Sequence, residues 1–466
     1  IGGEAEQHLH GMARSQSHPE IIYMSQDVGQ VWKSVDAGES WRKTLGKGLY
    51  LNFGQSIEVD PVNPNKVFVI VAPSYNWLAP SWSGLYRSLD GGDNWERVLR
   101  MDLANIRRIY QHAIAYDPSS ISNSEANRWY AATPDHGLVR SEDGGNNWTS
   151  PLGLTGIETV YDIKCHPSDG RTVYAGTNAG LYRSINRGEN MVLFGNLPSG
   201  AVASIEINPD NPQMVYAVIL GNGLYRSLDG GATFSLLKSF SAARLFMNYG
   251  YPNKLYLIGT VTRTIMSSDG GLTWYENTSA TGAEGLGREY KRNLYGEMSA
   301  LMPNPKDENE AVGYSRACCW KTTDGGRTYF DSSTLFTGFA CSWWADTVAF
   351  DRFDPKRFAT FNCDVGTIIT GNSGDFFNRR NDQAWNWYSV DRVIDWIGTY
   401  SGDIQPVANS QVMVASIGHY WRTKIMRTAD EGRNWQLVTD TNEQNLFISF
   451  HPNLSLIHIS EPTRPY

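Results

Sequence analysis

The chain has 466 residues, a formal net charge of −8 and an aromatic content of 12%. The acidic balance and the lack of a basic run argue against a nucleic-acid partner. No apolar stretch approaches the roughly 20 residues of a membrane-spanning helix, so we predict no membrane span.

A short segment recurs along the chain and reads Ser or Thr, any residue, Asp, one or two residues with Gly, then an aromatic residue. Its first copy is Ser34–Trp41, and Asn replaces Asp in a degenerate copy at Ser184–Met191. The other copies are Ser88–Trp95, Ser141–Trp148, Ser227–Phe234, Ser267–Trp274, Thr322–Tyr329 and Thr428–Trp435. A period of about 40 to 55 residues is typical of one four-stranded propeller blade. The last interval is twice as long, and we expect a decayed copy within it at Asn372–Phe376.

Each unit also contains an apolar strand, a polar turn that often carries Pro, and a second strand. Ile57–Pro61 leads to Val67–Ile70 in this way, and Gly84–Arg87 then reads as a third strand that enters the repeated segment. The repeated segment is therefore predicted to be a hairpin turn. Its Ser and Asp side chains would accept backbone N–H groups, and its Gly would take a positive φ.

These patterns predict an all-β propeller. The first seven copies, counting the degenerate one, end at Tyr329, so residues 11–342 are predicted to form a seven-bladed propeller. Residues 343–453 would form the first blades of a second propeller, and a single ring of nine or ten blades is the alternative. Residues 454–466 leave the pattern and resemble adaptor-derived sequence. The first residue is Ile1 rather than Met, which predicts a processed or incomplete N-terminus.

Two short segments open the two predicted propellers alike. Asp27-Val28-Gly29 and Asp364-Val365-Gly366 each follow the first predicted strand of their propeller. Asp135-His136-Gly137, at the corresponding position of another unit, has the Asp and the Gly but carries His in place of Val. An Asp before Gly is also an ordinary turn pattern, so a purely structural role for both aspartates is the alternative.

The repeat resembles the Asp-box (BNR) repeat of sialidases, sortilin-type receptors, photosystem assembly factors and family 74 xyloglucanases. The paired Asp-Val-Gly segments favour the xyloglucanases, whose tandem seven-bladed propellers enclose a cleft. That resemblance implies an inverting endo-β-1,4-glucanase or xyloglucanase with Asp27 and Asp364 as the acid and base, roles unassigned. Inverting enzymes hold such carboxyl groups roughly 6.5–9.5 Å apart. Gln30 and Thr367 replace the second Gly that usually follows in the family.

Several aromatic residues lie outside the repeated segments and suit a sugar-binding cleft, where aromatic faces cover pyranose rings. The insertion Ser74–Trp82 carries three of them, and long loops on a propeller often carry function. The predicted substrate-binding residues are Tyr75, Trp77, Trp82, Trp343, Trp344, Trp396 and Tyr420. Ordinary packing is the alternative for each.

The sequence leaves open whether the protein is an enzyme. The alternative is a non-catalytic extracellular propeller that binds glycan or protein, or self-associates in a matrix or filament. A β-glucan polysaccharide is the predicted partner of the enzyme. We predict no cofactor and no metal, since no P-loop, dinucleotide-binding or CxxC pattern is present. Sequons at Asn147 and Asn277 agree with a secreted, extracellular protein.

Overall fold

A computed structural model of the chain describes most of it and divides it into two compact units. The first, called here the ring unit, comprises His8–Thr281 and Asn293–Phe336. The second unit comprises Ile1–Gln7, Gly282–Arg292 and Thr337–Tyr466. The described residues are 9–26, 31–49, 53–72, 83–101, 112–133, 137–150, 154, 157, 159–259, 264–276, 279–281, 299–315, 318–332, 348–362, 366–370, 378–379, 398–419, 422–432, 434–440, 447–450 and 457–460.

The described part of the ring unit is a succession of small antiparallel sheets, each a meander of neighbouring strands. The first holds β1 (Leu9–Arg14), β2 (Ile22–Gln26), β3 (Trp32–Ser34) and β4 (Arg42–Lys43). The second holds β5 (Phe53–Val59), β6 (Val67–Ala72), β7 (Gly84–Ser88) and β8 (Glu96–Arg100). The third holds β9 (Ile114–Tyr116), β12 (Trp129–Thr133) and β13 (Gly137–Ser141), beside the hairpin β10 (Ile121–Ser122) and β11 (Glu125–Ala126) and the 3₁₀ turn Pro118–Ser120.

Four further sheets complete the described ring unit. The fourth holds β14 (Val160–Cys165), β15 (Val173–Thr177), β16 (Gly180–Ser184) and β17 (Val192–Leu193). The fifth holds β18 (Val202–Ile207), β19 (Val215–Ile219), β20 (Gly223–Ser227) and β21 (Ser235–Ser239). The sixth holds β22 (Ala242–Met247), β23 (Leu255–Gly259), β24 (Thr264–Ser267) and β25 (Tyr275–Glu276). The seventh holds β27 (Ala300–Asn304), β28 (Asp307–Ser315), β29 (Cys318–Thr322) and β30 (Thr328–Asp331), with β26 (Ser279–Thr281) parallel to β30.

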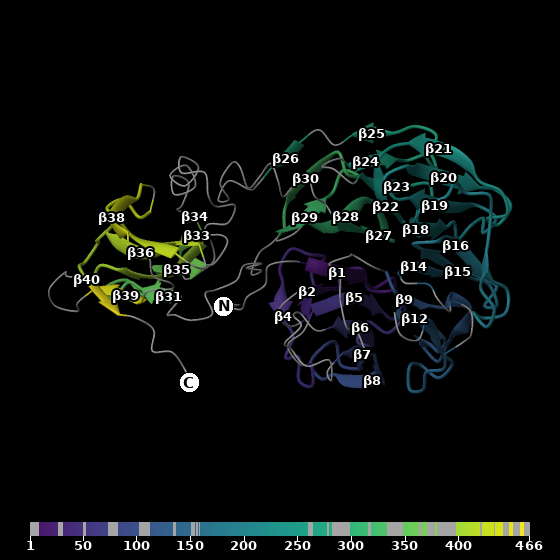
Figure 1. Cartoon of the computed structure of the whole chain (residues 1–466), viewed down its shortest axis with the longest axis horizontal. Helices are drawn as coiled ribbons and strands as arrows, with labels where there is room; N and C mark the ends of the chain where they lie inside the picture. The colour runs from purple at the N-terminus through teal and green to yellow at the C-terminus, as the bar shows by residue number, and fades with distance from the viewer. Residues whose placement is uncertain are drawn as a thin grey trace. The chain divides into compact units, whose positions relative to one another are not determined.

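The first strands of these sheets contact one another in chain order and the last contacts the first. The cyclic order is β1, β5, β9, β14, β18, β22 and β27, and β27 lies beside β1 where the purple and green parts meet in Figure 1. Inner strands pack between two neighbouring sheets, so every residue of β18 and β19 is buried. The outer strand β21 faces solvent and is largely exposed. This arrangement is a β-propeller, as the sequence predicted.

The repeated segment forms the turn between the third and fourth strands, and the predicted hydrogen bonds are confirmed. In the first copy, Ser34 Oγ donates to Asp36 Oδ1 over 2.7 Å, Gly38 N–H donates to Ser34 Oγ over 2.8 Å, and Ser40 N–H donates to Asp36 Oδ1 over 2.9 Å. Gly38 has a φ of +84°, the left-handed conformation that glycine adopts without strain. The same set recurs in the last described copy, around Asp430.

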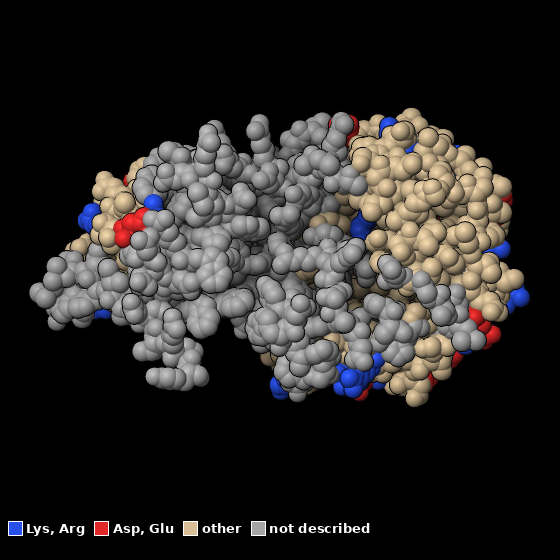
Figure 2. Space-filling view, in the orientation of Figure 1, with Lys and Arg blue, Asp and Glu red and all other residues tan. Residues whose placement is uncertain are grey.

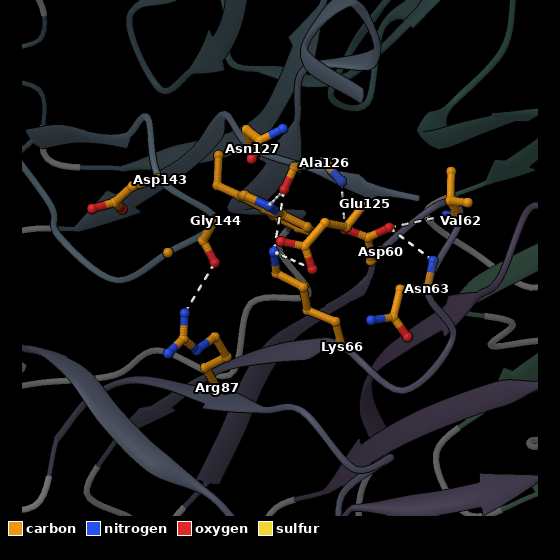
Figure 3. A network of polar contacts seen from close by, with 12 residues as sticks. Asp60, Val62, Asn63, Lys66, Arg87, Glu125, Ala126, Asn127, Asp143 and Gly144 are labelled. Atoms are coloured by element: carbon orange, nitrogen blue, oxygen red, sulfur yellow. Dashed lines mark hydrogen bonds and ion pairs between the residues drawn. The ribbon is translucent and has the colours of Figure 1, made fainter. Parts of the chain in front are cut away.

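Buried polar side chains join each sheet to the next, as Figure 3 shows for the second and third sheets. Asp60 Oδ2 accepts the backbone N–H of Ala126 over 2.8 Å, and Lys66 Nζ donates to the carbonyl oxygen of Ala126 over 3.2 Å. Arg87 donates to the carbonyl oxygen of Gly144, within the next repeated turn, over 3.1 Å. Each turn is therefore held partly by its own side chains and partly by the preceding sheet.

The second unit repeats the same pattern in its described part. One sheet holds β31 (Val348–Phe350), β32 (Phe358–Asn362), β33 (Gly366–Thr370) and β34 (Asn378–Arg379). Another holds β35 (Gly398–Ile404), β36 (Met413–His419), β37 (Arg422–Thr428) and β38 (Gln436–Asp440). A hairpin of β39 (Phe447–Phe450) and β40 (Ile457–Ser460) follows, and Asp403 Oδ2 accepts the backbone N–H of Phe450 over 2.9 Å.

The all-β fold class is confirmed. The boundaries at residues 342 and 453, and the blade count of the whole protein, stay predictions. Residues 457–460 of the predicted tail form β40, while its adaptor origin also stays a prediction. The expected decayed repeat at residues 372–376 lies outside the described residues.

Candidate functional site

All nine predicted site residues lie outside the described residues. They are the two aspartates Asp27 and Asp364 and the seven aromatic residues Tyr75, Trp77, Trp82, Trp343, Trp344, Trp396 and Tyr420. The strands that precede and follow them in the sequence are described, however. These strands define the connection to which each residue belongs.

Both aspartates fall between the second and third strands of a sheet. Asp27 lies between β2 and β3, and Asp364 lies between β32 and β33. In an antiparallel meander the second-to-third connection is at the same edge as the start of the first strand, because successive strands alternate in direction. The described strand ends that flank the two aspartates in the sequence therefore lie at this edge of their own units.

The repeated turns lie at the opposite edge, between third and fourth strands, and their Asp side chains are committed to the turn. Thr233 donates side-chain and backbone hydrogen bonds to Asp229, and with Ser227 these lower the pKa of Asp229 to about 2. The same bonds from Thr273 lower the pKa of Asp269 to about 2. Carboxylates that hold their charge so firmly are unsuited to act as general acids near neutral pH.

The described residues also line a partly open cavity of about 300 Å³ among the inner strands of the ring unit. Its polar lining comes mainly from Glu58, His112, Lys164, Glu206 and Tyr249. Its apolar lining includes Ile114, Tyr116, Ile163, Phe246 and Met247. We call it the channel cavity, because the strands that carry these residues follow one another around the ring.

Strand pairing places four of the residues that line the cavity at one level of the ring. Each is paired with the second residue of the next strand in its sheet: Glu58 with Phe68, Lys164 with Tyr174, Glu206 with Tyr216 and Phe246 with Tyr256. Ala115, paired with Tyr130, holds the same place on β9, between Glu58 and Lys164 in the ring order. A small side chain there leaves room between the two charges.

Lys164, Glu206 and Tyr249 form a mutually bonded set. Lys164 Nζ is 3.4 Å from Glu206 Oε1 and donates to Tyr249 Oη over 3.1 Å, and Tyr249 Oη donates to Glu206 Oε2 over 2.5 Å. Burial raises the pKa of Glu206 to about 7, against the attraction of Lys164. Burial opposes the charge of Lys164, but Glu206 and Tyr249 together raise its pKa well above the ordinary value. The ammonium group is therefore held charged beside its two partners.

Glu58 and His112 line the same cavity, and among the described residues their side chains have fewer hydrogen-bond partners than those of Lys164, Glu206 and Tyr249. Glu58 Oε1 accepts the backbone N–H of Val59, its own neighbour, over 3.0 Å. Burial raises the pKa of Glu58 to about 7. His112 Nε2 is buried and has no hydrogen-bond partner in the part of the chain that the structure describes. Burial, with Lys164 and Arg244, lowers the pKa of His112 well below its ordinary value. Carboxylates with such raised pKa values, lining a cavity, are typical of binding or proton-transfer sites.

Sequence reasoning did not identify this group. The signal was present, because Glu58, Lys164 and Glu206 occupy one position in three copies of the strand-and-turn pattern. A charged residue within an apolar inner strand could have been noticed, but its neighbours around the ring could not be known from spacing.

Comparisons with known proteins point to one group of enzymes. A xyloglucanase from Paenibacillus sp is 23% identical over 359 residues, covering 74% of this chain and 30% of that protein. A xyloglucanase from Hypocrea jecorina is 29% identical over 297 residues, covering 48% and 34%. The xyloglucanase Xgh74A from Acetivibrio thermocellus is 25% identical over 234 residues, covering 48% and 25%. The chain resembles family 74 xyloglucanases.

The structure agrees with this resemblance at the level of fold. An ancestral GH74 enzyme superposes with a TM-score of 0.64 at 15% identity, covering 98% of this chain and 66% of that one. A Niastella koreensis GH74 enzyme gives 0.62 at 13% identity, covering 96% and 75%. No protein-family model matches the chain. The matches span about a quarter to a third of the length of the xyloglucanases.

Three further observations concern surface charge, membrane-spanning helices and metal ligands among the described residues. On the face shown in Figure 2, the described Lys and Arg residues are scattered among Asp and Glu. Within the described ranges, no helix has the length and apolar character that a bilayer span needs. The part of the chain that the structure describes holds no group of three or more His, Cys, Asp or Glu residues placed to bind a metal ion.

Proposed function

We propose that this chain is part of a secreted glycoside hydrolase that cleaves a β-glucan of the xyloglucan type with inversion. Asp27 and Asp364 act as the catalytic acid and base. The seven aromatic residues named above bind the sugar chain. The observation that carries the proposal is the sequence resemblance to xyloglucanases over as much as 74% of the chain.

The chain topology supports the choice of carboxylates. Asp27 and Asp364 occupy the same second-to-third connection in two separate units and share the Asp-Val-Gly sequence. Connections of this kind carry function in many propellers, because they vary without disturbing the sheets. The aspartates of the repeated turns do not compete for the role, since their hydrogen bonds keep their pKa values low.

The test is release of reducing sugar from xyloglucan and mixed β-glucans, with Asp27→Ala and Asp364→Ala beside the parent protein. Loss of one carboxyl group of an acid–base pair typically lowers turnover by two or more orders of magnitude. Asp135→Ala is the matched control, because Asp135 falls in the corresponding connection between β12 and β13 but is followed by His-Gly instead of Val-Gly. We expect the first two variants to lose activity and the control to keep it.

The anomeric form of the first product provides a separate test of the stereochemical course of hydrolysis. Inversion places the attacking water on the face opposite the leaving group, so proton NMR should show the α-anomer from a β-linked substrate. A β-anomer product would contradict inversion, and the absence of any sugar release by folded protein would contradict the hydrolase proposal.

A further inference from the structure

The channel cavity lies in the ring unit, and the residues that line it are distinct from the nine proposed for hydrolysis. Its volume of about 300 Å³ is at the lower end of the range for ligand pockets, roughly 300–1,000 Å³. That space would hold about ten water molecules at about 30 Å³ each, or one small organic molecule.

The charges that line the channel cavity do not balance. Lys164 is committed to Glu206 and Tyr249 by the contacts described above. Glu58 lies at the same ring level on β5, with Ala115 of β9 between it and Lys164 in the ring order. Above pH 7, where Glu58 and Glu206 are both ionised and His112 is neutral, the described lining therefore has one negative charge in excess. Among the described residues, no ion pair involves Glu58.

The surroundings of Glu58 favour an organic ligand over a metal ion. A metal would need several carboxylate or imidazole groups together, and the described residues offer no such group. The cavity instead has the apolar and aromatic walls of Ile163, Tyr116 and Phe246. Aromatic faces and a carboxylate are together suited to a cation that carries hydrocarbon.

We propose that the channel cavity binds a small organic cation, an ammonium or guanidinium group on a short apolar body, with Glu58 as its counter-ion. The charged group lies against Glu58, and the hydrocarbon lies against the aromatic wall. His112 Nε2, which is buried and has no hydrogen-bond partner among the described residues, can accept a hydrogen bond from the ligand's N–H groups. This site is independent of the proposed hydrolysis and requires no polysaccharide.

Calorimetric titration of the whole chain at pH 8 tests the proposal, with butylammonium and propylguanidinium as probes. Butan-1-ol is the neutral probe of matched size and butyrate the anionic one. We expect at least one of the cations to bind, the alcohol to bind at least tenfold more weakly, and butyrate not to bind. Equal affinity for the alcohol, or no binding of either cation to folded protein, would overturn the proposal.

Two variants locate the site. Glu58→Gln should weaken cation binding at least tenfold while the protein folds, because the amide oxygen can still accept the Val59 N–H. Ala115→Leu should block binding by filling the space beside Glu58. Glu308→Gln is the matched control, since Glu308 is exposed and is not among the cavity's lining residues. Unchanged binding by Glu58→Gln would refute the assignment even if the parent protein binds the cation.

Discussion

Replacement of Trp41 by Phe should destabilise the ring more than the same change at Trp95. Both residues end a repeated segment and both are buried, at 1% and 6% exposure. Trp95 Nε1 donates within its own turn to the Gly92 carbonyl oxygen over 2.8 Å, and that oxygen also accepts the N–H of Gly46. Trp41 Nε1 instead donates over 2.8 Å to the carbonyl oxygen of Ser332, just after β30 of the seventh sheet. The Trp41 bond therefore spans the junction that closes the ring.

The loss of stability depends on whether the carbonyl oxygen keeps another hydrogen-bond donor after the substitution. Removing the donor from a buried carbonyl costs about 1–3 kcal/mol, whereas the loss of one of two donors costs nearer 0.5–1.5 kcal/mol. We expect Trp41→Phe to lower the free energy of unfolding by about 2–3 kcal/mol, including the lost ring volume, and Trp95→Phe by about 1–1.5 kcal/mol. Urea denaturation measures both values.

Amide hydrogen exchange distinguishes ring closure from local packing. Trp41→Phe should increase exchange both in β1–β4 and in β27–β30, because the two sheets share that junction, whereas Trp95→Phe should affect the second sheet and its nearest neighbours. Equal losses of stability for the two variants, or faster exchange confined to the first sheet after Trp41→Phe, would refute the reasoning.

Three further predictions concern the turns and the channel. Arg187 is exposed with a φ of +63°, so Arg187→Gly should stabilise the protein by about 0.5–1 kcal/mol, and a lower urea midpoint would contradict this. Gly145 has a φ of +89° and a Cβ there would strike the Phe68 ring, so Gly145→Ala should cost about 2–4 kcal/mol; an unchanged thermal midpoint would show that the turn can shift. The folded-state pKa of Glu58 lies above the unfolded value of about 4.5, so this group favours folding at low pH and costs stability as pH rises towards 7, by up to about 1.4 kcal/mol per pH unit. Glu58→Gln should therefore gain stability relative to the parent protein between pH 5 and pH 8, and a difference that stays constant with pH would argue against a buried carboxyl group.

The sequence alone determined the local structure of this protein. Each repeated turn is predictable because its bonds connect residues two to four positions apart, as between Ser34, Asp36 and Gly38. The inner strands were also predictable from the sequence, since burial between two sheets requires runs of apolar residues such as those of β19. Repetition of these units at a propeller's period then predicted the fold class.

Only the tertiary structure decided which distant residues meet. Glu58, Lys164 and Glu206 come to one ring level because β5, β14 and β18 share a register with their partner strands and the ring brings them around one cavity. Trp41 and Trp95 end the same motif, yet ring closure gives Trp41 a partner in the seventh sheet. Such contacts depend on how the sheets close on one another, and no local pattern encodes that geometry.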